Sequence, residues 1–151
     1  LVDNKVIIGG EYQLTTALEN MKNKGIKFVP GQVTEWLDCG NKDAVVNTNQ
    51  RYLEYIREEK LIADSAIIEN SIIIEPVFLG ENVKLTNAVV GPHVSIGANS
   101  TVTNSIVKNS IIQEESTIAN ANIKSSMLGS KVYYEGVAQN VSIGDYNVIK
   151  P

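Results

Sequence analysis

The chain has 151 residues, 43% of them hydrophobic, and a net charge of −4, which allows one or two domains with a buried core and gives no electrostatic footprint for nucleic acid or an anionic membrane. No apolar run is long enough to span a membrane, and no secretory signal opens the chain. The single cysteine, Cys39, excludes an internal disulfide framework and favours a cytoplasmic location.

A first helix is predicted after Gly9-Gly10, because apolar residues recur there at the helical spacing i, i+3, i+4 and i+7. These residues are Leu14, Ala17, Leu18 and Met21. Gly25 is expected to end the helix. Residues 26–29 and 32–36 are predicted as two strands around a Pro30-Gly31 turn.

A second helix is predicted over residues 42–58, with Asn41 as its N-terminal cap. Its apolar side consists of Val45, Tyr52, Leu53 and Ile56. Two helices and one strand pair are too little for a stable α/β domain. We therefore divide the chain at residue 60 and expect residues 1–60 either to pack on the part that follows or to need partners from a longer chain. A start at Leu1 rather than at methionine also suggests a fragment.

From residue 62 onward the sequence repeats with a period of 17 residues. The matching segments are Ile62–Ile68, Leu79–Leu85 and Ile96–Val102, and a second set is Asn70–Ile73, Asn87–Val90 and Asn104–Val107. Self-similarity at a fixed short period is typical of a solenoid. Within each repeat, pairs of small or aliphatic residues one position apart recur, and residues i and i+2 of a strand point to the same side. The sequence thus predicts a three-sided parallel β-helix over residues 61–151.

Stacked coils place equivalent residues above one another, so the repeat predicts which side chains fill the core. The inward columns are Val77/Val94/Ile111 and Ile73/Val90/Val107, whereas Gly80/Gly97 and Asn82/Asn99 lie at corners. Glycine and asparagine tolerate the positive φ that a corner needs. Beyond Ala119 the register slips, residues 133–136 are predicted as a bulge or loop, and residues 141–149 restore the motif.

Leu79–Val83 and Ile96–Ser100 each consist of an aliphatic residue, a glycine, two free positions and a further apolar or small residue. This motif resembles that of the hexapeptide-repeat family of left-handed β-helices. The resemblance alone implies the left hand, because general crossover rules favour a right-handed coil. The expected fold class is therefore mainly β: a left-handed parallel β-helix preceded by a small α/β segment.

Residues 10–15 and 35–40 are similar to the closing segments of the sugar-1-phosphate nucleotidyltransferase family, where a Trp-hydrophobe-Asp-x-Gly loop ends a strand. The resemblance implies that Asp38 is a ligand of Mg²⁺ and that Trp36 and Gly40 shape the substrate-binding loop. Mg²⁺ prefers hard oxygen ligands, which agrees with this role. The alternative is that Asp38 is an ordinary turn aspartate. Where the family has an aspartate after Leu-Thr, this chain has Thr16.

The family's glycine-rich, basic nucleotide loop does not occur in this sequence. We therefore interpret residues 1–60 as the last part of a nucleotidyltransferase α/β domain, and we do not expect the 151-residue chain alone to turn over sugar nucleotides. For the full-length enzyme, the resemblance implies attack of a sugar-1-phosphate oxygen on the α-phosphorus of a nucleoside triphosphate, with Mg²⁺ as cofactor and pyrophosphate as product. Glucose-1-phosphate with dTTP is the commonest pairing that it suggests.

His93 is the second candidate for chemistry. Several acyltransferases that resemble this β-helix use one histidine as general base, a role that imidazole suits near neutral pH. The predicted column neighbours of His93 are Pro76 and Ser110, which places it at an outer corner without a partnering carboxylate motif. The sequence favours a corner histidine without a catalytic role.

Ile72, Val89 and Ile106 stack in one column and are predicted to point outwards, with Phe78 and Ile112 on the neighbouring face. An outward apolar row on a solenoid is an assembly surface or the seat of another domain. We expect homo-oligomerisation through the β-helix. Besides the nucleotidyltransferase, two functions stay open: an acyltransferase module, and a non-catalytic oligomerisation or regulatory module.

Overall fold

The computed structural model describes residue 7 and residues 9–137 of the chain. By its internal contacts the chain divides into two compact units, residues 1–36 and residues 37–151. The second unit contains both the solenoid and the helix that precedes it. The boundary predicted at residue 60 separates the last part of a nucleotidyltransferase domain from the β-helix, and it stays a prediction.

Helix α1 (Leu14–Asn23) lies in the first unit, in the predicted place. Gly25 ends it with a φ of +85°, and its N–H donates to the Lys22 carbonyl at 2.9 Å. The predicted strand pair is wrong, because residues 26–36 contain no strand and all of their side chains are exposed. A two-stranded ribbon without an apolar face to cover is marginal in water, and this segment buries none of its apolar side chains.

The second unit begins with helix α2 (Lys42–Tyr55), which Asn41 caps by accepting the Ala44 N–H at 2.9 Å. The helix is three residues shorter than predicted. The solenoid then follows in thirteen short strands within the described residues. They are β1 (Ile67–Glu69), β2 (Ile72–Ile73), β3 (Val77–Leu79), β4 (Lys84–Thr86), β5 (Val89–Val90), β6 (Val94–Ile96), β7 (Thr101–Thr103), β8 (Ile106–Lys108), β9 (Ile111–Ile112), β10 (Thr117–Ala119), β11 (Asn122–Lys124), β12 (Met127–Leu128) and β13 (Tyr133–Glu135).

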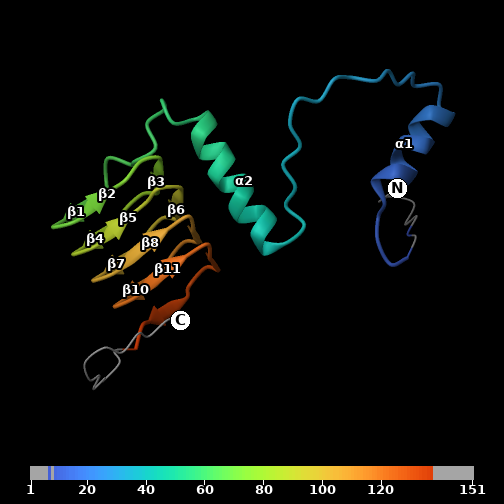
Figure 1. The fold of residues 1–151 in the computed structure, drawn as a ribbon. Helices are drawn as coiled ribbons and strands as arrows, with labels where there is room; N and C mark the ends of the chain where they lie inside the picture. Colours follow the sequence, from blue (N-terminus) through green and yellow to red (C-terminus); the bar gives the residue numbers. More distant parts are fainter. Residues whose placement is uncertain (1–6, 8, 138–151) are drawn as a thin grey trace, which may run out of the picture. The chain divides into compact units, whose positions relative to one another are not determined.

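The strands form three parallel sheets, and each sheet takes every third strand (Figure 1). The orders are β1-β4-β7-β10-β13, β2-β5-β8-β11 and β3-β6-β9-β12. All pairs are parallel, because each strand lies directly above its equivalent in the coil before it. The predicted three-sided parallel β-helix is confirmed, with about four turns.

Aliphatic side chains from all three sheets fill the centre of the solenoid. Those with no exposed surface are Val83, Leu85, Val90, Val94, Ile96, Val102, Val107 and Ile118. Four serines are buried beside them: Ser100, Ser105, Ser110 and Ser116. Each hydroxyl donates to a main-chain carbonyl and accepts a main-chain N–H from the following coil, at 2.7–3.3 Å. The buried serines are therefore satisfied, and they join successive coils.

Asparagine residues turn one corner of every coil in the left-handed conformation. Asn70, Asn87, Asn104 and Asn120 have φ values of 44° to 52°, and each amide donates to the oxygen of the side chain one coil later. Asn82 and Asn99 also have a positive φ, at the corners after β3 and β6, and the Asn82 amide donates to Oδ1 of Asn99. Gly80 and Gly97 lie at corners, as predicted, but the predicted reason was wrong, because neither glycine has a positive φ. A Cβ on Gly97 would lie 2.5 Å from the main-chain nitrogen of Glu114, so these glycines are needed for close approach.

The repeat shortens from 17 to 16 residues earlier than predicted. Thr101 pairs with Lys84, which lies 17 residues earlier, and with Thr117, which lies 16 residues later. The change in spacing falls after β8. Three residues separate Val90 from Val94, including Gly91-Pro92 with its cis peptide bond, whereas two separate Val107 from Ser110. The third coil therefore turns the corner between β8 and β9 with one residue fewer than the second coil has between β5 and β6.

This shift overturns three predictions. Ser110 fills the inward column that was assigned to Ile111, and Ile112 is buried with 1% exposure instead of lying outside. Residues 133–135 form β13 and pair with β10 at 16-residue spacing, so they are not a bulge. The segment 141–149, which was predicted to restore the motif, lies outside the described residues.

Candidate functional site

The candidate metal loop, residues 37–41, immediately precedes α2. Oδ1 of Asp38 accepts the main-chain N–H of Gly40 at 3.1 Å, which is the local turn that an aspartate two residues before a glycine forms. The Thr48 hydroxyl donates to the Asp38 carbonyl at 2.8 Å and ties the loop to the second turn of the helix. A Cβ on Gly40 would lie 3.3 Å from Oδ2 of Asp38, so glycine leaves room for the carboxylate.

The Asp38 side chain is exposed, and so is Cys39 beside it. An exposed carboxylate is able to reach a hydrated cation, and Mg²⁺ in phosphoryl-transfer sites takes one or two carboxylates together with substrate phosphates. Asp38 therefore fits Mg²⁺ as one ligand. Among residues 7 and 9–137, no group of three or more histidine, cysteine, aspartate or glutamate side chains is placed to hold a metal ion. The other ligands would have to come from phosphate groups or from further parts of the protein.

The first unit contains Trp36, whose side chain is 81% exposed. An indole with that exposure makes little contact with its own unit, so its predicted role in shaping a substrate-binding loop stays a prediction.

His93 lies at the corner before β6, as predicted, with a φ of +61°. The shortened repeat places Asn109 rather than Ser110 beside it in the next coil. Its Nε2 lies 2.6 Å from Oε1 of Glu54 on α2, and the two side chains are 16% and 38% exposed. The expected lack of a carboxylate partner was therefore wrong. Sequence reasoning missed Glu54 because it lies 39 positions away on another element and no spacing rule joins the two.

Contacts with His93 and with nearby arginines govern the charge of Glu54. The hydrogen bond with His93 is the largest influence, and it lowers the pKa of Glu54 below its ordinary value of 4.5. Desolvation opposes this shift, whereas the charges of Arg57 and Arg51 support it. Arg57 also pairs with Glu54 at 3.3 Å. Glu54 is thus held as a carboxylate at neutral pH, facing the solenoid on one side and Arg57 on the other.

Two further hydrogen bonds join α2 to the solenoid. The Ser95 hydroxyl on β6 donates to Oδ1 of Asn49 at 2.6 Å. Nζ of Lys42 donates to the Ser125 carbonyl at 3.1 Å. Together with His93–Glu54, these contacts run along the sheet β3-β6-β9-β12, beside which Figure 1 shows the helix.

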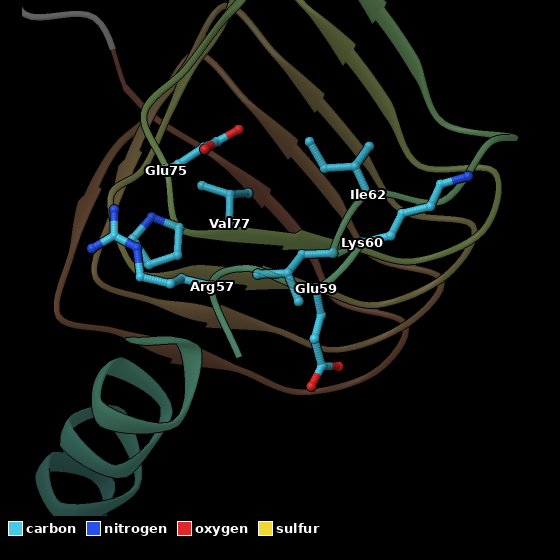
Figure 2. Close-up of a pocket in the computed structure, with 8 residues that line it drawn as sticks. Arg57, Glu59, Lys60, Ile62, Glu75 and Val77 are labelled. Carbon is cyan, nitrogen blue, oxygen red and sulfur yellow. The ribbon is translucent and has the colours of Figure 1, made fainter. Parts of the chain in front are cut away.

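A pocket of about 300 Å³ opens where the chain passes from α2 into the first coil (Figure 2). Val77 and Ile62 lie at its centre, with Arg57 and Glu75 toward one side and Lys60 toward the other. Its cations are engaged, since Arg57 pairs with Glu54 and Lys60 with Asp64. The pocket therefore offers no unpaired charge for an anionic ligand from these two residues.

The part of the chain that the structure describes contains no helix of the length and hydrophobicity that a membrane crossing requires.

Comparison with known proteins gave three similar sequences, whereas no family model and no solved structure matched. Glucose-1-phosphate thymidylyltransferase from Streptomyces antibioticus is 26% identical in an alignment that covers 82% of this chain and 39% of that protein. The protein of the same name from Streptomyces griseus is 25% identical in an alignment that covers 91% of this chain and 45% of the relative. Bifunctional protein GlmU from Clostridioides difficile (strain 630) is 27% identical in an alignment that covers 93% of this chain and 34% of the relative.

The chain spans less than half the length of each of these relatives. The similarity extends over most of this chain, and the described β-solenoid agrees with the hexapeptide repeat predicted from the sequence. The chain is homologous to glucose-1-phosphate thymidylyltransferase and to GlmU, and the predicted resemblance to sugar-1-phosphate nucleotidyltransferases is confirmed.

Proposed function

We propose that this chain is the C-terminal portion of a sugar-1-phosphate nucleotidyltransferase, which joins a nucleoside triphosphate and a sugar-1-phosphate into a nucleotide sugar and releases pyrophosphate. The observation that carries this proposal is the similarity to two thymidylyltransferases together with an exposed aspartate in the loop before α2. Glucose-1-phosphate and dTTP are the proposed substrates, because the names of those two relatives specify glucose-1-phosphate and a thymidylyl group, for which dTTP is the nucleoside triphosphate donor. The proposed location is the cytoplasm.

In the proposed reaction, the carboxylate of Asp38 would be one ligand of Mg²⁺. Bound Mg²⁺ would neutralise charge on the phosphates and orient them for in-line displacement. The contribution of this chain is to keep the carboxylate exposed and fixed in direction. The turn to Gly40 and the hydrogen bond from Thr48 support that direction.

The test uses the complete protein that contains this chain and measures pyrophosphate release from dTTP and glucose-1-phosphate with Mg²⁺. Asp38→Asn removes the charge and keeps the shape. We expect kcat/KM to fall by about a hundredfold or more, since metal ligation supplies several kcal/mol of charge stabilisation and each 1.4 kcal/mol is a factor of ten. Asp43→Asn is the matched control, because Asp43 is also exposed and lies five residues away in the first turn of α2. Equal activity of the two variants would remove Asp38 from the site.

We propose homo-oligomerisation as the second role of the solenoid. The outward row on β2, β5 and β8 supports it: Ile72 and Ile106 are 61% and 50% exposed, and Val89 lies between them. Ile106→Glu places a charge on this surface and is expected to shift the sedimentation coefficient toward the monomer. Thr101→Glu adds the same charge on the adjacent sheet and serves as control. A wild-type chain that sediments as a monomer at high concentration contradicts this role.

The acyltransferase alternative depends on His93 as a general base. Its Nε2 faces Glu54 at 2.6 Å, and the side chain is only 16% exposed beside α2. A general base has to reach the proton of the acceptor group, so the geometry favours a structural pair at this position. Binding of acetyl-CoA that is lost in His93→Ala would reverse this preference.

A further inference from the structure

Helix α2 meets the solenoid through one face, whose residues have the helical spacing i, i+4, i+7 and i+11. They are Lys42, Val46, Asn49 and Leu53. Val46 and Leu53 are 3% and 2% exposed, and the two polar members hydrogen-bond to the solenoid. Glu54, at the next position, reaches His93. Two buried side chains and three polar contacts, spread over the length of the helix, therefore fix α2 to the sheet.

The Asp38 loop is in turn fixed to α2. Thr48, one turn inside the helix, donates its hydroxyl to the Asp38 carbonyl at 2.8 Å. Asn41 closes the loop as the helix cap, with its side chain on the Ala44 N–H. Because both contacts end on the first two turns of α2, a displacement of the helix on the sheet displaces the Asp38 carboxylate with it.

We propose that Ser95 and His93 are positioning residues for the Asp38 loop. They hold α2 on the sheet β3-β6-β9-β12, and the loop is hydrogen-bonded to that helix. The solenoid therefore fixes the position of the loop, in addition to its proposed role in assembly. The coupling between the solenoid and the Asp38 loop follows from the hydrogen bonds described above and does not depend on the proposed function. Only the purpose of the link, to place a metal ligand, rests on the proposed function.

The contact between Ser95 and Asn49 has more effect than an average surface hydrogen bond. Nδ2 of Asn49 is buried and has no hydrogen-bond partner within the described residues. The amide group of Asn49 therefore depends on the hydrogen bond that its Oδ1 accepts from the Ser95 hydroxyl on β6. Removing the Ser95 hydroxyl would leave a buried amide unsatisfied at both ends, which costs more than the loss of an exposed hydrogen bond. Ser95 lies between the buried Val94 and Ile96 and points away from the core, so its substitution leaves the packing of the coil intact.

The test measures amide hydrogen exchange of the 151-residue chain by mass spectrometry, for Ser95→Ala, His93→Gln and wild type. Exchange of the peptides that cover residues 37–48 is expected to become about three to ten times faster in each variant, the factor that one lost hydrogen bond produces. Peptides from β5, β8 and β11, on another sheet, are expected to keep their rates. Ser130→Ala, in an exposed turn, is the matched control for Ser95→Ala.

Ser95→Thr keeps the hydroxyl and is expected to restore slow exchange, which a general loss of stability would not do. Asn49→Ala removes the same contact from the helix side and leaves the solenoid sequence unchanged, so it replaces Ser95→Ala if that variant fails to fold. Wild-type exchange rates at residues 37–48 in Asn49→Ala and His93→Gln overturn the inference.

The complete protein supplies the second readout. In Ser95→Ala, the Mg²⁺ concentration that gives half-maximal activity is expected to rise about three- to tenfold, with a smaller change in kcat at saturating Mg²⁺. The two proposals fail separately. Faster loop exchange combined with full activity of Asp38→Asn would keep the link between coil and loop and remove the metal-ligand assignment. Unchanged loop exchange combined with an inactive Asp38→Asn would do the opposite.

Discussion

The stacked corner asparagines Asn70, Asn87, Asn104 and Asn120 allow the conformational role of a corner residue to be separated from its hydrogen bonds. Asn104 has a φ of +48°, its amide donates to Asn120 at 3.3 Å, and its oxygen accepts from Asn87 at 3.1 Å. A left-handed conformation costs a residue with a Cβ about 1–2 kcal/mol, and asparagine is among the residues that bear it best. An exposed neutral hydrogen bond contributes about 0.5 kcal/mol. Both terms act at this one position.

Asn104→Ala loses two hydrogen bonds and takes the full conformational penalty, so we expect a loss of about 2.5 kcal/mol in the free energy of unfolding. Asn104→Gly loses the same hydrogen bonds, avoids the penalty and adds about 0.5 kcal/mol of chain entropy in the unfolded state, which gives about 1.5 kcal/mol. Alanine is thus expected to be the more damaging substitution, by about 1 kcal/mol.

Urea denaturation followed by far-ultraviolet circular dichroism measures this difference. Asn122→Ala is the control, because Asn122 is an exposed strand residue without a positive φ, and its effect is expected to stay within about 0.5 kcal/mol. An Asn104→Gly variant that is as unstable as Asn104→Ala would refute the conformational argument, since the hydrogen bonds alone would then account for both losses.

Three further outcomes follow from the same contacts. Leu85→Ala, at a position with no exposed surface, should lower the free energy of unfolding by about 2–5 kcal/mol in urea titration; a loss below about 1 kcal/mol contradicts the dry core. Gly97→Ala should cost about 1–3 kcal/mol in the same assay, because its Cβ would lie 2.5 Å from the nitrogen of Glu114 and the coils would have to separate; an unchanged urea midpoint is the contrary result. Glu54 has a lowered pKa in the folded chain, so its contribution is present above its ordinary pKa and is lost as the pH falls through the folded value. Thermal unfolding between about pH 6 and pH 3 should therefore lose more stability in wild type than in Glu54→Gln, and parallel curves would show that the pair with His93 contributes nothing.

The 17-residue period by itself determined the architecture of residues 62–108. A short strand, an inward pair of side chains and a left-handed corner are all local events, so residues such as Val77, Val94 and Asn99 indicate them without knowledge of the rest of the chain. Parallel stacking then repeats each event one coil later, which is why the columns and the outward row of Ile72 and Ile106 could be predicted. The Asp38 loop came from a resemblance rather than from periodicity.

Only the tertiary structure decided where the repeat shortens and which face of α2 is buried. The corner near Asn109 has one residue fewer, and the 17-residue period does not itself indicate which corner carries the deletion. The predicted apolar side of the helix included Tyr52, which is 56% exposed, because that prediction counted hydrophobic residues alone. The actual face mixes Val46 and Leu53 with polar residues whose partners lie on β6 and at the corner between β11 and β12. Hydrogen bonds between distant elements leave no periodic trace in a sequence.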